Sequence, residues 1–497
     1  MKATALTAAG LTAYAASAVL AQGSCPITLK PAYPQPVVGT GYTTRLIASS
    51  LNRPRSLLFD ASGKMLVLEG RSGIRRLGFT DHGSTCVEVT ENNVVIADTS
   101  LTHGIALSND GKTLFASSAT QVFAWAYDPA TGKISGNKKV VINGMGSSGH
   151  TTRTLLMSQK SPGTLIVSYG SNGNLDEAAL NAQSGVSQIR AFDMRTLPAQ
   201  PINYATGGRR LGWGLRNSVG VAEEPTTGGI YSVENSADQM TRDGVDIHQN
   251  NPGEELNFHG TANRTTDGGN HGYPTCFALW DTNVPKVGSM TTGSQFVMKT
   301  DGSVTDAKCN SDYVAPRLTF PAHTAPLDVI FTPDGKTAYV SLHGSWNRDE
   351  RVGYKLSSIA FANGQPVAAK NSKTALNDVL SNPSLSACPD NCFRPVGLAI
   401  DKQNRLFMTS DSTGDIWVLK RGDFTALGGG GNQVTSSASR GNIAEDSSTV
   451  AQGSAPSSVS TGAAATLVRG GGGGSTSAVV VGAVVAAASL VFTSLMI

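Results

Sequence analysis

The sequence predicts an all-β fold, a six-bladed β-propeller, and three observations predict it. A strand-turn-strand unit recurs six times along the chain. A further short strand follows several of these units, as it would in a blade. Self-similarity at periods of tens of residues is typical of repeat folds, and blades of short antiparallel strands around an axis are the β version.

The units share one pattern, in which a polar turn rich in Gly, Asp, Asn, Pro or Lys separates two apolar halves, as in a hairpin. In chain order they occupy Ser56 to Glu69, Gly104 to Ser117, Thr154 to Tyr169, Val219 to Val233, Leu327 to Leu342 and Val396 to Ser410. Further strands follow at Gly73 to Leu77, Gln121 to Trp125, Ser187 to Phe192 and Gly414 to Leu419. Two stacked sandwiches are the alternative, and the regular inner-strand pattern favours the propeller.

The fifth unit, within Pro321 to Lys355, shows the pattern most completely. Its second strand leads directly into a base, an aromatic plate and a fixed cation, in the residues His343, Trp346, Asn347 and Arg348. We therefore expect a site where this strand ends. Trp346 suits either the core or a stacking contact with a flat ligand.

The largest gap between units runs from Asn235 to Leu318. It is rich in Gly, Asn, Asp and Thr and holds two of the six cysteines. A long insertion in a compact domain is usually functional or disordered, and a disulfide within it would argue for order. We expect a loop excursion over one face of the propeller.

Residues 1–21 have the layout of a secretory signal peptide, since Lys2 precedes an alanine-rich apolar run that closes on small residues. The propeller domain is expected over residues 22–425. An exported chain with six cysteines suits an oxidising compartment. Pairing Cys388 with Cys392, Cys276 with Cys309 and Cys25 with Cys86 is the simplest arrangement, and all fifteen connectivities remain open.

The other end has a Ser/Gly-rich linker over residues 426–475 and an apolar tail over 476–497. About twenty apolar residues can span a bilayer, so a transmembrane anchor is one interpretation. No basic residues follow the tail, and small residues within Gly470 to Ser475 favour a GPI-attachment signal instead. We expect a secreted protein held at the cell surface by a lipid.

The formal net charge of +3 is small for 497 residues. It favours neither nucleic acid nor an acidic membrane surface as a partner. Asn263 begins a glycosylation sequon, Asn-Arg-Thr, in the excursion. We expect a monomer.

Arginines stand where several units begin or end, and arginines at recurring blade positions would converge near the axis. Planar guanidinium groups suit carboxylates and phosphates, so together they favour a polyanionic ligand, although each taken singly suits a salt bridge between blades. The residues at these positions are Arg55, Arg216 with Asn217, Arg348 and Arg394.

His150 precedes the third unit and is placed to act as a general base. A histidine that only hydrogen-bonds a loop is an equally good interpretation, because His103 and His323 occupy similar positions. The fourth unit ends in Glu234 and an acidic segment that continues to Glu255. Such oxygen donors suit Ca²⁺, and a solvated acidic loop is the alternative.

At these residues the chain resembles the soluble sugar dehydrogenases that use pyrroloquinoline quinone (PQQ), especially the fungal pyranose dehydrogenases and the sorbosone dehydrogenase-like propellers. The resemblance covers about Arg55 to Lys420. It rests on the segments GHTTRTL, WGLRNSVG with ENSAD, PAHTAPL, LHGSWNR with GYK, and FRPVGLA with TSDSTGDI.

The resemblance implies a six-bladed propeller with the quinone on its axis and His150 as the base, and we add Asp176 as the carboxylate that orients His150. It also implies Ca²⁺ at the turn of Ser236, Ala237 and Asp238, bound largely through backbone carbonyls. The expected cofactor-binding residues are Arg55, Arg216, Asn217, His343, Trp346, Arg348 and Arg394.

The expected activity is oxidation of an aldose or ketoaldose in its pyranose form, with electrons passed to an external acceptor such as a cytochrome domain protein, a quinone or a copper enzyme. A non-catalytic propeller that binds carbohydrate or protein at the cell surface is the alternative. A calcium-dependent lactonase is a third, because fold alone does not fix function, but the arginine cluster fits it poorly.

Overall fold

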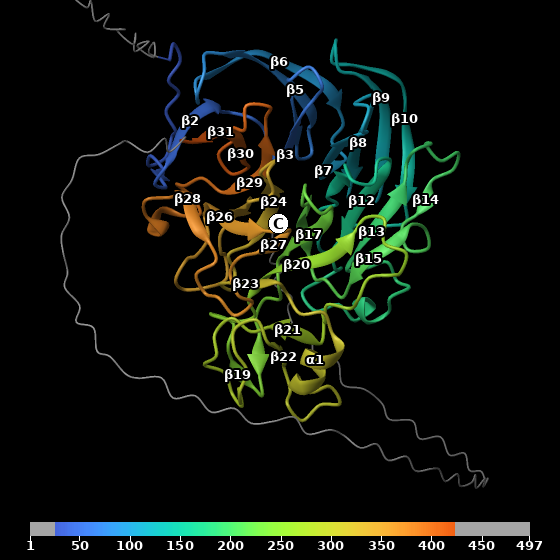
Figure 1. Ribbon diagram of the computed structural model, residues 1–497, viewed down its shortest axis with the longest axis vertical. Coiled ribbons are helices and arrows are strands. Elements are labelled where there is room, and N and C mark those ends of the chain that lie inside the picture. Colours follow the sequence, from blue (N-terminus) through green and yellow to red (C-terminus); the bar gives the residue numbers. More distant parts are fainter. Residues whose placement is uncertain (1–24, 423–497) are drawn as a thin grey trace, which may run out of the picture. The chain divides into compact units, whose positions relative to one another are not determined.

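The computed structural model describes residues 25–422, and these form a six-bladed β-propeller (Figure 1). The predicted signal peptide, linker and apolar tail lie outside the described residues. Within residues 25–422, no helix is both long and apolar enough to cross a bilayer.

The first four strands of each of the first three blades follow the chain in order and pair antiparallel, with the first strand innermost. Blade 1 contains β3 (Pro54–Phe59), β4 (Met65–Glu69), β5 (Gly73–Asp81) and β6 (Val87–Ala97). Blade 2 contains β7 (Leu101–Leu107), β8 (Thr113–Ser118), β9 (Val122–Asp128), β10 (Lys133–Asn143) and the short parallel β14 (Ile202–Asn203). Blade 3 contains β11 (Leu155–Met157), β12 (Thr164–Tyr169), β13 (Gln188–Asp193) and β15 (Arg209–Trp213), with the 3-10 turn η1 (Glu177–Leu180) before β13.

The last three blades take strands from more distant parts of the chain. Blade 4 contains β16 (Ser218–Glu223), β17 (Gly229–Glu234), β20 (Glu254–Thr261) and β23 (Leu318–Phe320). Blade 5 contains β24 (Pro326–Phe331), β25 (Thr337–Leu342), β26 (Lys355–Ala362), β27 (Gln365–Pro366), β28 (Asn377–Ser381) and β1 (Val37–Val38). Blade 6 contains β29 (Pro395–Ile400), β30 (Leu406–Ser410), β31 (Asp415–Arg421) and β2 (Tyr42–Ala48), and η2 (Leu385–Ala387) precedes it.

All six predicted units form the first two strands of a blade, so the propeller prediction is confirmed. The further strands predicted after four units are the third strands β5, β9, β13 and β31, whereas the outermost strands were not predicted. In particular, β2 pairs with β31, with Leu46 opposite Trp417, and this closes the ring by joining the two ends of the repeat.

The core lies between the blades. In β4, Met65 and Val67 pack toward blade 6, whereas Leu66 and Leu68 pack toward blade 2. Alternate residues of a strand point to opposite faces, so a strand in the middle of a propeller is apolar on both faces. This explains why the second half of each unit is a continuous apolar run.

The inner strands approach one another closely at glycines. A Cβ on Gly104 would lie 2.0 Å from the carbonyl oxygen of Arg153 in the neighbouring blade, and one on Gly397 would lie 2.7 Å from that of Arg55. Only glycine fits these positions. The glycines at the start of the units therefore let the first strands converge on the axis.

The excursion is ordered and is interrupted by a blade strand. β20 divides it, so the prediction of one loop from Asn235 to Leu318 is wrong in this respect. The rest builds a small lobe (yellow-green and yellow in Figure 1) with β18 (Thr241–Arg242), β19 (Val245–Asp246), β21 (Cys276–Ala278), β22 (Gln295–Val297) and helix α1 (Asp306–Asp312).

The three disulfides follow the simplest pairing. Cys25 bonds to Cys86, Cys276 to Cys309 and Cys388 to Cys392. The second of these crosslinks the excursion lobe, where Arg242 is fully buried and pairs with Asp306 of α1. The lobe is therefore held by its own core as well as by the disulfide.

Candidate active site

The predicted site residues gather at one face of the propeller. The first strand of each blade begins at this face, and the antiparallel second strand ends there. Arg55 lies at the start of β3, Arg216 and Asn217 precede β16, and His343 follows β25. Residues far apart in the sequence therefore meet around the axis.

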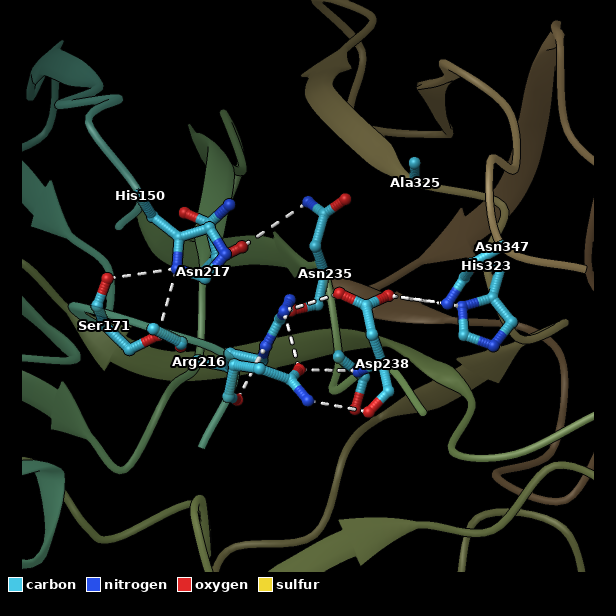
Figure 2. A network of polar contacts seen from close by, with 12 residues as sticks. His150, Ser171, Arg216, Asn217, Asn235, Asp238, His323, Ala325 and Asn347 are labelled. Atoms are coloured by element: carbon cyan, nitrogen blue, oxygen red, sulfur yellow. Dashed lines mark hydrogen bonds and ion pairs between the residues drawn. The ribbon is translucent and has the colours of Figure 1, made fainter. Parts of the chain in front are cut away.

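His150 is fixed through one ring nitrogen. Its Nδ1 lies 3.0 Å from the backbone oxygen of Ser171 and 3.0 Å from the Oγ of Ser171 (Figure 2). A carbonyl oxygen only accepts, and the Ser171 hydroxyl already donates to the carbonyl of Gly173 at 2.6 Å. Nδ1 must therefore carry the hydrogen, which leaves Nε2 as an unprotonated acceptor.

The environment keeps His150 neutral. The side chain is buried, and burial followed by the nearby charge of Arg216 lowers its pKa to about 3. Nε2 makes no hydrogen bond to any residue between 25 and 422. A neutral imidazole with a free Nε2 is the form that can accept a proton.

Asp176 makes no hydrogen bond to His150 among the described residues, so it does not orient the imidazole directly as predicted. Its carboxylate accepts hydrogen bonds from the backbone and side-chain nitrogens of Asn172, at 2.7 and 2.9 Å. The contact with His150 comes from Ser171 instead. Asp176 acts one step away, because it holds the loop that carries Ser171.

Arg216 has its hydrogen-bonding groups occupied by the protein. Its guanidinium donates to the carbonyl of Asn174 at 3.1 Å, the amide oxygen of Asn174 at 2.9 Å and the carboxylate of Asp238 at 2.8 Å. A further contact reaches the carbonyl of Asn235 at 3.3 Å. Arg216 is thus fixed in place without a ligand.

Asp238 links this network to the next blade. Its second carboxylate oxygen accepts from Asn347 at 2.9 Å and lies 3.7 Å from Nδ1 of His323. Figure 2 shows Asp238 between Arg216 and these two residues. Its backbone oxygen accepts from Asn174 at 2.7 Å. The oxygens of Asp238 are therefore already in use.

The other two residues of the predicted metal turn differ from Asp238. Within residues 25–422, the backbone oxygens of Ser236 and Ala237 accept no hydrogen bond, and no cluster of three or more acidic, histidine or cysteine side chains suits a metal ion. A cation at this turn would therefore use carbonyl oxygens. Ser236 and Ala237 fit that role better than Asp238.

The solvated-loop alternative for the acidic segment is wrong for its three glutamates, whereas Asp246 in the same segment is exposed. Glu234 ends β17, Glu254 and Glu255 begin β20, and all three are buried. Glu254 accepts from the backbone nitrogen of Ser236 at 2.6 Å, and burial raises its pKa to about 8. Glu254 therefore holds the turn at Ser236, while Glu234 accepts from the backbone nitrogen of Arg216 at 2.6 Å.

A second cluster joins blades 1, 5 and 6. Asp411 accepts from Arg55 at 2.5 Å and from Nε2 of His343 at 2.8 Å. Although burial opposes ionisation, His343 and Arg55 hold the pKa of Asp411 well below its ordinary value. Arg55 thus makes the salt bridge between blades that was the alternative interpretation for each arginine.

His343 keeps one unpaired ring nitrogen. Burial lowers its pKa to about 4, so the ring is neutral with its hydrogen on Nε2. Nδ1 is buried and has no hydrogen-bond partner among the described residues. An unpaired buried acceptor is costly, so this atom suits a donor supplied by a ligand.

The remaining predicted residues lie at the edge of the site. Arg394 donates to the carbonyls of His343 and Gly344 at 3.3 and 3.4 Å. Arg348 contacts the carbonyl of Glu350 and, at 3.3 Å, the side chain of Asn250 in the excursion. Trp346 is 62% exposed, which rules out the core and leaves its ring available for stacking.

Sequence reasoning missed Ser171 and Asp411. Both lie within two residues of the end of a second strand, as His343 does. The same position in other blades holds Asn235 and Arg71. Applying this positional rule to every unit would have identified them.

Comparison with known proteins adds to this geometry. A family model described as TrAA12-like matches residues 36–422. The chain is 48% identical over 408 residues to a pyrroloquinoline quinone-dependent sugar dehydrogenase of Hypocrea jecorina (strain QM6a), with 81% of this chain and 93% of that protein covered.

Two solved structures are similar over the propeller. A calcium structure of a Trichoderma reesei carbohydrate-active enzyme of family AA12 has 49% identity and a TM-score of 0.78, covering 80% of this chain and 99% of that one. The holo form of the pyranose dehydrogenase PQQ domain from Coprinopsis cinerea has 36% identity and a TM-score of 0.75, with the same coverage.

Proposed function

The chain belongs to the TrAA12-like family, and we propose that it is a PQQ-dependent dehydrogenase that oxidises a pyranose sugar, an aldose or a ketoaldose, at its hemiacetal or hydrated carbonyl carbon. The observation that carries this proposal is His150. Its Nδ1 hydrogen is committed to Ser171, so Nε2 is available to take a hydroxyl proton.

The donor set around the axis fits the cofactor. PQQ is a tricarboxylate with a pyrrole N–H. Arg55 and Arg394 offer guanidinium groups to the carboxylates, and His343 offers its unpaired Nδ1 to a donor. When bound, the quinone supplies a carbon that accepts a hydride from the sugar.

The residues of this chain supply the rest of the chemistry. As the C–H hydride leaves the sugar carbon, the hydroxyl proton moves to Nε2 of His150. Ser171 holds the imidazole in the required tautomer, and Arg216 near the ring disfavours early protonation. The carbonyl oxygens of Ser236 and Ala237 would hold Ca²⁺, which polarises a bound carbonyl as a Lewis acid.

Reconstitution tests the proposal. Purified apoprotein is loaded with PQQ and Ca²⁺, and reduction of an artificial dye is followed with a panel of aldoses and ketoaldoses. We expect sugar-dependent reduction that is lost on chelation of Ca²⁺. A protein that takes up PQQ but reduces no dye with any sugar would support the non-catalytic propeller instead.

We also propose that the enzyme is exported, glycosylated at Asn263 and held at the cell surface by a GPI lipid, with electrons passing to a separate acceptor. The terminal sequence patterns support this. Treating intact cells with phosphatidylinositol-specific phospholipase C should release the protein into the medium. Retention on the cells would favour a transmembrane tail.

A further inference from the structure

A small basic notch opens beside Thr151 and Thr152, the two residues that follow His150 in the chain. Its walls come from blades 1 and 2 and from the segment that follows His150, and its volume is about 60 Å³. A volume of this size admits a small group of a few non-hydrogen atoms, such as a carboxylate or a phosphate. The notch is lined by Arg53, Arg55, Gly70, Arg71, Thr102, Thr151 and Thr152.

Two of its arginines have no counter-charge. Arg53 and Arg71 are exposed, and within residues 25–422 neither side chain forms an ion pair or a hydrogen bond. The nearby acids are occupied, since Glu69 pairs with Arg75 at 3.0 Å and Asp411 pairs with Arg55. The notch therefore carries positive charge that no described residue neutralises and N–H donors that no described residue accepts from.

The backbone holds both arginines firmly. Arg53 and Arg71 adopt left-handed conformations, with φ of 49° and 62°, which a residue with a Cβ rarely adopts. The carbonyl of Arg53 accepts from Gly70 at 3.0 Å, and the nitrogen of Arg71 donates to Leu101 at 2.8 Å. The turn is thus fixed by main-chain hydrogen bonds and does not depend on the guanidinium groups.

Arg71 occupies the position just after the second strand of its blade, and in other blades this position faces the site. It lies two residues beyond the end of β4, as Ser171 lies two residues beyond the end of β12. Thr151 and Thr152 follow the base directly in the chain. An anion in the notch would therefore lie beside the chain segment that directly follows the base.

We propose that Arg53 and Arg71 bind the anionic group of an acidic sugar, so that the substrate class is a sugar with a carboxylate or phosphate remote from the reacting carbon. This inference rests on the proposed dehydrogenase function. Two guanidinium groups that line the same notch are suited to binding a carboxylate or a phosphate. A charge-assisted contact of this kind corresponds to about 10- to 100-fold in affinity.

The test uses the enzyme loaded with PQQ and Ca²⁺ and matched sugars. Steady-state kinetics compare galacturonate with galactose and galactose 6-phosphate with galactose. We expect kcat/KM for one acidic sugar to exceed that of galactose by about tenfold or more. A preference for galacturonate would identify the bound group as a carboxylate, and a preference for galactose 6-phosphate would identify it as a phosphate. In the double variant Arg53→Ala/Arg71→Ala, this preference should be lost, mainly through KM.

Arg421→Ala is the matched control, because Arg421 is also exposed and lacks an ion pair within the described residues. It should keep the preference. Equal kcat/KM values for acidic and neutral sugars in the unaltered enzyme would overturn the inference. It would also be overturned if the double variant kept its sugar preference and lost only affinity for PQQ, or only the rate of electron transfer to an acidic acceptor protein.

Calorimetric binding of galacturonate and galactose 6-phosphate to the PQQ-loaded protein separates the two proposals. If no sugar is oxidised but an acidic sugar binds and the double variant abolishes binding, the notch stands and the proposed reaction fails. If galactose is oxidised and neither acid binds more tightly than galactose, the reaction stands and the notch inference fails.

Discussion

The two sides of the site differ in how completely the protein satisfies its own polar groups. On one side, His150 donates its Nδ1 hydrogen to Ser171, and the guanidinium group of Arg216 donates to Asn174 and Asp238. On the side of blade 1, Arg53 and Arg71 have no partner among the described residues. The side of His150 and Arg216 is therefore fixed before a ligand arrives, whereas Arg53 and Arg71 expose N–H donors that a ligand can bind in place of solvent.

The largest effect is expected on the satisfied side. Replacing His150 by Ala removes the proton acceptor but none of the guanidinium groups, so turnover should fall by about 10²- to 10⁴-fold while PQQ still binds. Stopped-flow dye reduction gives the turnover, and fluorescence titration gives the PQQ affinity. Near-normal turnover would show that His150 only supports its loop.

Asp411 tests the buried, paired cluster that joins blades 1, 5 and 6. Asp411→Ala leaves Arg55 and His343 buried without their partner, and breaking a buried pair costs about 3–5 kcal/mol. Thermal unfolding of the apoprotein should show a clearly lower Tm. An exposed pair provides the control, since removing Asp193 from Arg195 should change Tm little. Similar Tm values for both variants would contradict the difference in burial.

Ser171 tests the positioning of the base. Ser171→Ala keeps the backbone acceptor and removes the hydroxyl, so kcat should fall by about tenfold with little change in KM. Ser171→Asp places a carboxylate beside Nδ1, which should raise the pKa of His150 and move the acidic limb of the kcat/KM profile to higher pH. An unmoved limb would mean that the two side chains are not coupled.

The smallest effect concerns pH and stability. Burial raises the pKa of Glu255 to about 7 and lowers that of His271 to about 3. The stability from Glu255 is complete below its unfolded pKa of about 4.5 and is lost as pH rises toward 7. The stability linked to neutral His271 is lost as pH falls from about 6.5 toward 3.

The apoprotein should therefore be most stable between about pH 4.5 and 6.5. Tm measured across pH 3 to 9 checks this, with Glu255→Gln expected to flatten the alkaline fall. A Tm that rises steadily through pH 8 would show that other groups dominate.

The sequence by itself determined the repeat and the positions that face the site. Alternating apolar residues, turn residues and glycines are local signals, and they located the first two strands of every blade. His150, Arg55, Arg216 and His343 could be identified because each lies beside a predicted strand end.

Only the tertiary structure decided which groups the site residues bind and which strand closes the ring. Arg55 and Asp411 are 356 residues apart, and β2 closes the ring against β31 from the far end of the propeller. Ser171 and Asp176 are both near His150 in sequence terms, and only the loop geometry selects Ser171. Which arginines stay unpaired is likewise fixed by the fold, because strand spacing places a side chain on a face but carries no information about the distant groups that meet it there.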